Sequence, residues 1–123
     1  MGIDVVGQNA ALLNLVVEQG ATFQFAGTLY DPKFNPKKPV DLTGFTAAMQ
    51  VREQPSSPDV LFDFTPYIVL GDTLGTVVIT VPSTVTATLA WGAGHYDLEL
   101  KSGAGIVTRL CKGSIRVDKE VTR

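Results

Sequence analysis

His95 and Asp97 come closest to a catalytic arrangement of residue types in this chain. They stand two apart in a run where Tyr96, Leu98 and Leu100 alternate with polar residues, so in a strand they would share one face. A serine, histidine and aspartate triad also needs an activated serine, and the sequence has no G-x-S-x-G motif to supply one. We therefore interpret His95 as a partly exposed structural residue beside a turn.

The sequence lacks the residues that a typical metal-binding or phosphate-binding site needs. His95 and Cys111 are the single histidine and the single cysteine, whereas catalytic zinc usually has three protein ligands and structural zinc four. The glycine pairs in 92–94 and 103–105 begin like dinucleotide-binding loops, but strand patterns rather than helices follow them. We expect no metal, no cofactor and no small-molecule substrate, and we interpret the protein as not an enzyme.

Bulk properties narrow the class of protein. A chain of 123 residues corresponds to one domain, and a net charge of −2 argues against nucleic acid as a partner. One cysteine cannot form an internal disulfide, and the start has no secretory signal pattern, so we expect folding in a reducing compartment. No apolar run is long enough for a membrane span, and we expect no membrane association.

Alternation of apolar and polar residues recurs along the chain and predicts strands. The predicted strands cover 12–17, 23–30, 45–52, 60–65, 68–70, 77–81, 96–101 and 106–117. Ser83 can cap one short helix near 83–90, and Gly113 inside the last strand suggests a bulge. About eight strands separated by turn signals predict an all-β fold, a single antiparallel β-sandwich.

Tyr96 heads a strand directly after a glycine-containing corner, as in the tyrosine corner of Greek-key sandwiches. We expect it to be buried, with its hydroxyl bonded to backbone upstream, near 89–92. Trp91 and Gly94 belong to the same structural corner, and we expect Trp91 to pack into the core. Cys111 falls in a strand beside Leu110, and we expect a buried, inert thiol.

The chain divides into an arm at 1–11, a sandwich at 12–118 and a short tail at 119–123. We expect the arm to extend away from its own domain and to contact another subunit. Its candidate contact residues are Ile3, Val5 and Val6, whose β-branched side chains suit pairing with a sheet edge.

The proline-rich loop at 31–39 holds further candidate subunit contacts: Phe34, Lys37 and Lys38. One interpretation is an ordinary solvated loop. The other is a contact surface, because an aromatic side chain held in a proline-stiffened loop loses little freedom on binding.

Five stretches taken together resemble a known family. They are LVVEQGATFQF at 15–25, VDLTGFTAAMQVRE at 40–53, GTVVITVP at 75–82, GHYDLEL at 94–100 and VTRLCKGSIRVDKEVTR at 107–123. They resemble small virion proteins of tailed bacteriophages, which are Ig-like β-sandwiches similar to the N-terminal domain of phage upper baseplate proteins. The resemblance implies a structural protein located in the virion, in the tail, baseplate, neck or head surface, and assembled in the host cytoplasm. It also implies packing in many copies against itself and other virion proteins, with no catalytic residue.

Two other classes of function stay open from the sequence. A carbohydrate- or receptor-binding module would stack a sugar on an exposed aromatic side chain, and an exposed Trp91 would favour it. An assembly chaperone or a head decoration protein is the third hypothesis. Stoichiometry in purified particles would distinguish these classes.

Overall fold

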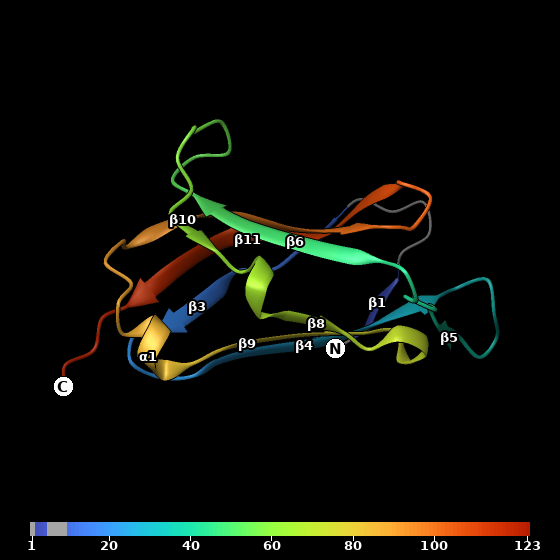
Figure 1. The fold of residues 1–123 in the computed structure, drawn as a ribbon, viewed down its shortest axis with the longest axis horizontal. Coiled ribbons are helices and arrows are strands. Elements are labelled where there is room, and N and C mark those ends of the chain that lie inside the picture. The colour runs from blue at the N-terminus through green and yellow to red at the C-terminus, as the bar shows by residue number, and fades with distance from the viewer. Residues whose placement is uncertain (1, 5–9) are drawn as a thin grey trace.

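Two β-sheets packed face to face form the body of the molecule, which confirms the predicted sandwich (Figure 1). The computed structural model describes residues 2–4 and 10–123, with side chains from residue 10 onward. The first sheet has the order β1-β4-β9-β8, with β5 also paired to β4. Its strands are β1 (Gly2–Asp4), β4 (Phe23–Asp31), β5 (Lys38–Pro39), β8 (Ile68–Leu70) and β9 (Thr76–Val81).

The second sheet has the order β2-β11-β10-β6-β7, with β3 also paired to β11. Its strands are β2 (Ala11–Leu12), β3 (Leu15–Glu18), β6 (Thr46–Arg52), β7 (Phe62–Asp63), β10 (Ala93–Lys101) and β11 (Val107–Asp118). Each predicted strand region contains at least part of a strand, while β1 and β5 lie where we expected an arm and a loop.

Alternating side chains from both sheets fill the core between them. β9 contributes Val77, Ile79 and Val81, and β10 contributes Leu98 and Leu100, all at most 2% exposed. The period of two in each strand directs these residues inward and their polar neighbours outward. At one end of the core the ring of Phe64 contacts the rings of Phe23 and Phe62.

Helical structure in the described part of the chain is shorter than the sequence indicated. α1 covers only Ser83–Thr86, and two single 3₁₀ turns, η1 (Thr65–Tyr67) and η2 (Asp72–Leu74), flank β8. After Thr86 the chain continues in tight turns, with Thr88 N–H donating to the Val85 carbonyl and Leu89 N–H to the Thr86 carbonyl. Threonine and valine are poor helix formers, which is consistent with the early end of α1.

Thr86 ties α1 to the turn between β3 and β4. Its side chain is fully buried, and its hydroxyl donates to the Ala21 carbonyl at 2.7 Å. The same oxygen accepts the Gly20 N–H at 3.1 Å. Gly20 has a φ of +86°, a conformation that glycine adopts without steric penalty, so the chain can turn from one sheet into the other.

The pairing is not antiparallel throughout, which corrects one detail of the prediction. β1 runs parallel to β4, and β2 and β3 both run parallel to β11. These three pairs join strands that are distant in sequence, and parallel neighbours need such long connections. The first part of the chain therefore contributes an edge strand to each sheet before the antiparallel body begins.

The predicted arm is not a free extension. Gly2–Asp4 align with residues 28–30 of their own domain, with Ile3 opposite Leu29, and Ala11 aligns with Cys111. The prediction that residues 1–11 extend away from the sandwich is therefore wrong for these positions. Short β-branched segments pair with whichever sheet edge is available, and here the domain's own edge is the nearest. Val5 and Val6 lie outside the described residues.

Gly113 has a different role from the bulge that its position suggested. The register shift falls between Leu98 and Glu99, which face Cys111 and Arg109, so Leu110 is the extra residue. Gly113 pairs regularly with Tyr96. A Cβ atom on Gly113 would collide with the Leu13 carbonyl oxygen and lie 3.0 Å from Asn14 Oδ1. The glycine therefore allows the β2–β3 connection to lie directly against β11.

Replacing Gly113 with alanine should destabilise the fold by about 1–3 kcal/mol, because the added methyl group overpacks a backbone contact that cannot bend away. The measurement is unfolding in urea, monitored by the fluorescence of Trp91. The matched control is Gly92→Ala, since a Cβ at Gly92 meets no atom of the described residues within 4 Å. Gly92→Ala should change the stability by less than about 1 kcal/mol. Equal effects of the two substitutions would contradict the proposed role of Gly113.

Candidate functional site

The β2–β3 connection is held against β11 and β10 by three hydrogen bonds. Leu13 N–H donates to the Lys112 carbonyl at 2.9 Å, and Ser114 N–H donates to Asn14 Oδ1 at 3.1 Å. The Tyr96 hydroxyl donates to the Leu13 carbonyl at 2.8 Å. Both backbone polar groups of Leu13 are thereby satisfied at a point where the β2 and β3 ladders are interrupted.

Tyr96 is buried as expected, but its hydrogen bond is not that of a tyrosine corner. The acceptor lies 83 residues upstream at Leu13, not in the expected stretch at 89–92. The Tyr96 side chain reaches across the sheet to the β2–β3 connection. β10 is a central strand, and β11 lies between β10 and β2. Burial raises the pKa of the Tyr96 phenol, so this hydroxyl remains a donor over the ordinary pH range.

The other two corner residues have distinct structural roles. Trp91 packs against the core, as expected, although its side chain is only half-buried. Its Nε1 is buried and has no hydrogen-bond acceptor in the described part of the chain. Gly94 is buried, and a Cβ there would lie 2.7 Å from the Arg52 carbonyl oxygen. Gly94 therefore lets β10 approach β6 closely.

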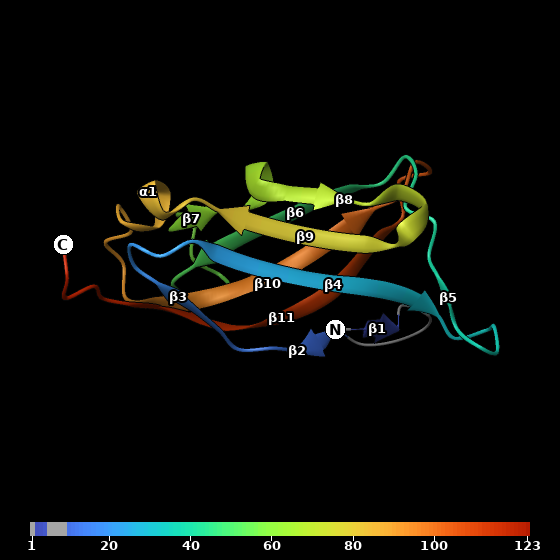
Figure 2. The ribbon, with the colours of Figure 1, turned by 90° about the horizontal axis from the view of Figure 1, so that it is seen from below.

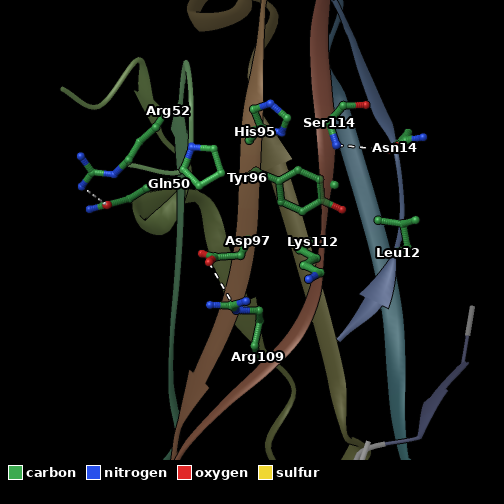
Figure 3. Close-up of a pocket in the computed structure, with 12 residues that line it drawn as sticks. Leu12, Asn14, Gln50, Arg52, His95, Tyr96, Asp97, Arg109, Lys112 and Ser114 are labelled. Carbon is green, nitrogen blue, oxygen red and sulfur yellow. Dashed lines mark hydrogen bonds and ion pairs between the residues drawn. The ribbon is translucent and has the colours of Figure 1, made fainter. Parts of the chain in front are cut away.

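A polar hollow of about 670 Å³ lies on the outer face of the second sheet (Figure 3). Its lining comes from β2, β6, β10 and β11 and consists of Leu12, Asn14, Gln50, Arg52, Pro55, His95, Tyr96, Asp97, Arg109, Lys112, Gly113 and Ser114. Gln50 and Arg52 border one side of it and Leu12 and Asn14 the other. β2 and the β2–β3 connection thus form one wall of the hollow.

Charged groups of both signs meet in the hollow. Asp97 and Arg109 form an ion pair at 3.5 Å, with both side chains about half exposed. The Arg52 guanidinium donates to the Ser57 carbonyl at 2.9 Å, to the Pro58 carbonyl at 2.8 Å and to Gln50 Oε1 at 3.0 Å. These bonds fix the loop that follows β6, which rises beyond the second sheet in Figure 1.

His95 and Asp97 share the outer face of β10, as their spacing predicted, and Ser114 lies opposite His95 on β11. Among the described residues, no hydrogen bond joins these three side chains. Within residues 2–4 and 10–123, no group of three or more histidine, cysteine, aspartate or glutamate residues could hold a metal ion. In the same residues, no helix has the length and apolar character of a membrane span.

The other sequence-derived candidates lie at one end of β4. Phe34 is 45% exposed, and the Lys38 ammonium lies 4.5 Å from the centre of its ring. β5, which contains Lys38, pairs with Tyr30 and Asp31, and Ile3 on β1 aligns with the neighbouring Leu29. The structure therefore brings the Ile3 backbone and the loop containing Phe34 and Lys37 to the same end of the first sheet.

Cys111 is buried on the inner face of β11, as expected, and is not bonded to another cysteine. Burial raises the pKa of its thiol, which keeps it in the unreactive protonated form.

No family model matches this sequence, and no curated protein matches it. Solved structures do match, among them the N-terminal domain of phage TP901-1 ORF48, with a TM-score of 0.52 and 12% sequence identity. The alignment covers 96% of this chain and 95% of that domain. The two share a fold from end to end, and the resemblance to an upper baseplate protein is confirmed at the level of fold.

Sequence patterns missed both the anchoring of Leu13 and the polar hollow. Alternation alone would have placed Gln50, Asp97 and Lys112 on outer faces, but it could not show that β6, β10 and β11 are neighbours. The contact between Gly113 and Leu13 left one signal, a glycine inside a strand, which also indicates close backbone approach.

Replacing Tyr96 with phenylalanine should lower the free energy of unfolding by about 1–2 kcal/mol, because the buried Leu13 carbonyl loses its donor. Urea unfolding measures the change. Tyr67→Phe is the control, since Tyr67 stacks on Phe62 and its hydroxyl has no hydrogen-bond partner in the described residues. The control should change stability by less than about 0.5 kcal/mol. A loss below that value for Tyr96→Phe would mean that water replaces the hydroxyl.

Proposed function

We propose that this protein is a structural subunit of a tailed-phage virion, in the tail, baseplate or neck, and that it acts by packing in multiple copies against virion proteins. The observation that carries the proposal is the likeness in fold to a phage domain, which extends over 96% of this chain. The sequence resemblance to upper baseplate proteins supports the same class.

The outer face of the first sheet has the character of a packing surface. Ala26, Val78 and Val69 lie in one row across β4, β9 and β8. The neighbouring outward positions are uncharged as well: Gln24, Thr28, Thr76 and Thr80. Val69 is 67% exposed and Val78 is 38% exposed. Such a face loses little hydration energy on contact with another protein, because burying a charge is what makes association costly.

The end of β4 offers a second contact region. Phe34 provides an exposed ring, and the Lys38 ammonium above it adds a cation that a partner carboxylate can pair with. Lys37 and the strand containing Ile3 flank this region. We propose that this end contacts a neighbouring subunit.

The carbohydrate-binding alternative depends on an exposed aromatic platform. Trp91 packs against the core and has a buried Nε1, so its ring is not displayed as sugar-stacking residues are. Head decoration differs from a tail position only in where the subunits sit, and the location of the protein in purified particles distinguishes the two.

Val69→Lys should leave the isolated domain folded, with a melting temperature within a few degrees, because the side chain is already mostly exposed. It should nevertheless sharply reduce incorporation into particles, since it places a charge in the uncharged row. Quantitative mass spectrometry of purified particles measures copy number for the wild-type and variant chains. The control is Val107→Lys, which alters a valine of similar exposure, 55%, on the opposite sheet.

Wild-type protein absent from particles, or present only at trace levels, would contradict the virion role. Incorporation of Val69→Lys at the level of Val107→Lys would contradict the assignment of the packing face while leaving the virion role in place.

A further inference from the structure

The polar hollow lies on the sheet opposite the uncharged packing face. It is open to solvent between the β2–β3 segment and the end of β6, with Leu12 on one side and Arg52 on the other (Figure 3). Leu12 is 72% exposed, although it is a large apolar residue beside a polar surface. The packing role proposed above gives no function to this concave face.

The charge in the hollow is opposite in sign to that of the whole protein. Arg52, Arg109 and Lys112 contribute three cations against the single carboxylate of Asp97, so the lining carries +2 with His95 neutral. The full chain carries −2. A concave surface with an excess of one sign attracts ligands of the other sign.

Two of the three cations are available to a ligand. The Arg52 guanidinium is engaged by two carbonyls and Gln50, so it supplies charge rather than free donors. Arg109 meets Asp97 through Nε, and its terminal nitrogens make no hydrogen bond to any residue that the structure describes. The Lys112 ammonium has no hydrogen-bond or ion-pair partner in the described residues. Charged donors of this kind form the stronger hydrogen bonds to carboxylates.

The dimensions favour a chain over a single ion. A volume of about 670 Å³ is many times that of one inorganic anion and lies within the usual range of roughly 300–1,000 Å³ for ligand sites. The available cations are on β11, while Gln50 and the Arg52-anchored loop are across β10. Asn14, Gln50 and Ser114 provide the neutral polar side chains that a peptide backbone requires.

We propose that this hollow binds an extended acidic peptide segment of a partner protein, with its carboxylates at Lys112 and Arg109 and its backbone across β10. The inference stands on the charge and shape of the hollow, and a failure of the virion role would not remove it.

The test uses the full chain in solution with three fluorescein-labelled peptides that are identical except at alternate positions, which carry aspartate, asparagine or lysine. Fluorescence anisotropy should detect the aspartate peptide alone, with affinity falling as salt rises, because exposed charge pairs are screened. Two-dimensional NMR should place the shifted amides at Asn14, His95, Lys112 and Ser114.

Lys112→Gln should weaken binding about two- to fivefold, the range for one exposed charge pair, and Lys112→Gln with Arg109→Gln about tenfold. Arg116→Gln is the matched control. Arg116 lies on the same strand, its side chain is 59% exposed and it does not line the hollow. Removing its charge should change affinity by less than about twofold.

Four results would overturn the proposal. They are no binding of the aspartate peptide, equal binding of the asparagine peptide, an equal loss in Arg116→Gln, and shifted amides outside the hollow. Inorganic phosphate or a short DNA duplex that competes as well as the peptide would also reject a peptide ligand.

Discussion

The hydrogen bond from the Tyr96 hydroxyl to the Leu13 carbonyl fixes the segment formed by β2 and β3 to the rest of the sandwich. It crosses β11 at Gly113, the one position where a missing side chain leaves room for the Leu13 backbone. With Leu13 fixed, β2 and β3 can pair in parallel with the two halves of β11. The chain then turns at Gly20, held by Thr86, and enters β4 of the opposite sheet. The closure of this edge of the sandwich therefore depends on a central strand reaching an edge strand.

This constraint also shapes the two outer faces. Pairing of β2 and β3 with β11 places Leu12 and Asn14 beside β11, where they border the polar hollow (Figure 3). The first sheet turns β4 and β9 toward the viewer in Figure 2. Its outer face carries the uncharged row formed by Ala26, Val78 and Val69. The two outer faces of the sandwich therefore differ in charge, with ionic side chains in the hollow of one and an uncharged row on the other.

The sequence allowed prediction of the sandwich, because alternation in 77–81 and 96–101 records which side chains face the core. It also indicated the burial of Tyr96 and Cys111 and the shared face of His95 and Asp97. It could not indicate the acceptor of Tyr96, since an acceptor 83 residues away depends on which strands become neighbours. The pairing of Gly2–Asp4 with β4 was missed for a similar reason. A three-residue strand carries no periodicity, and its position is decided by an available sheet edge.

Amide hydrogen exchange followed by NMR tests this central claim most directly. If the β2–β3 segment is an integral part of the sandwich, the amides of Leu13 and Ser114 should exchange only through global unfolding. The amides of Leu98 and Ile115 in the core strands should behave in the same way. Their exchange free energies should then agree with those of the core within about 1 kcal/mol and fall in parallel when Tyr96 is changed to phenylalanine. Exchange of the Leu13 and Ser114 amides at the rate of exposed loop amides, with the core amides still protected, would show that the β2–β3 segment detaches from the sandwich without global unfolding.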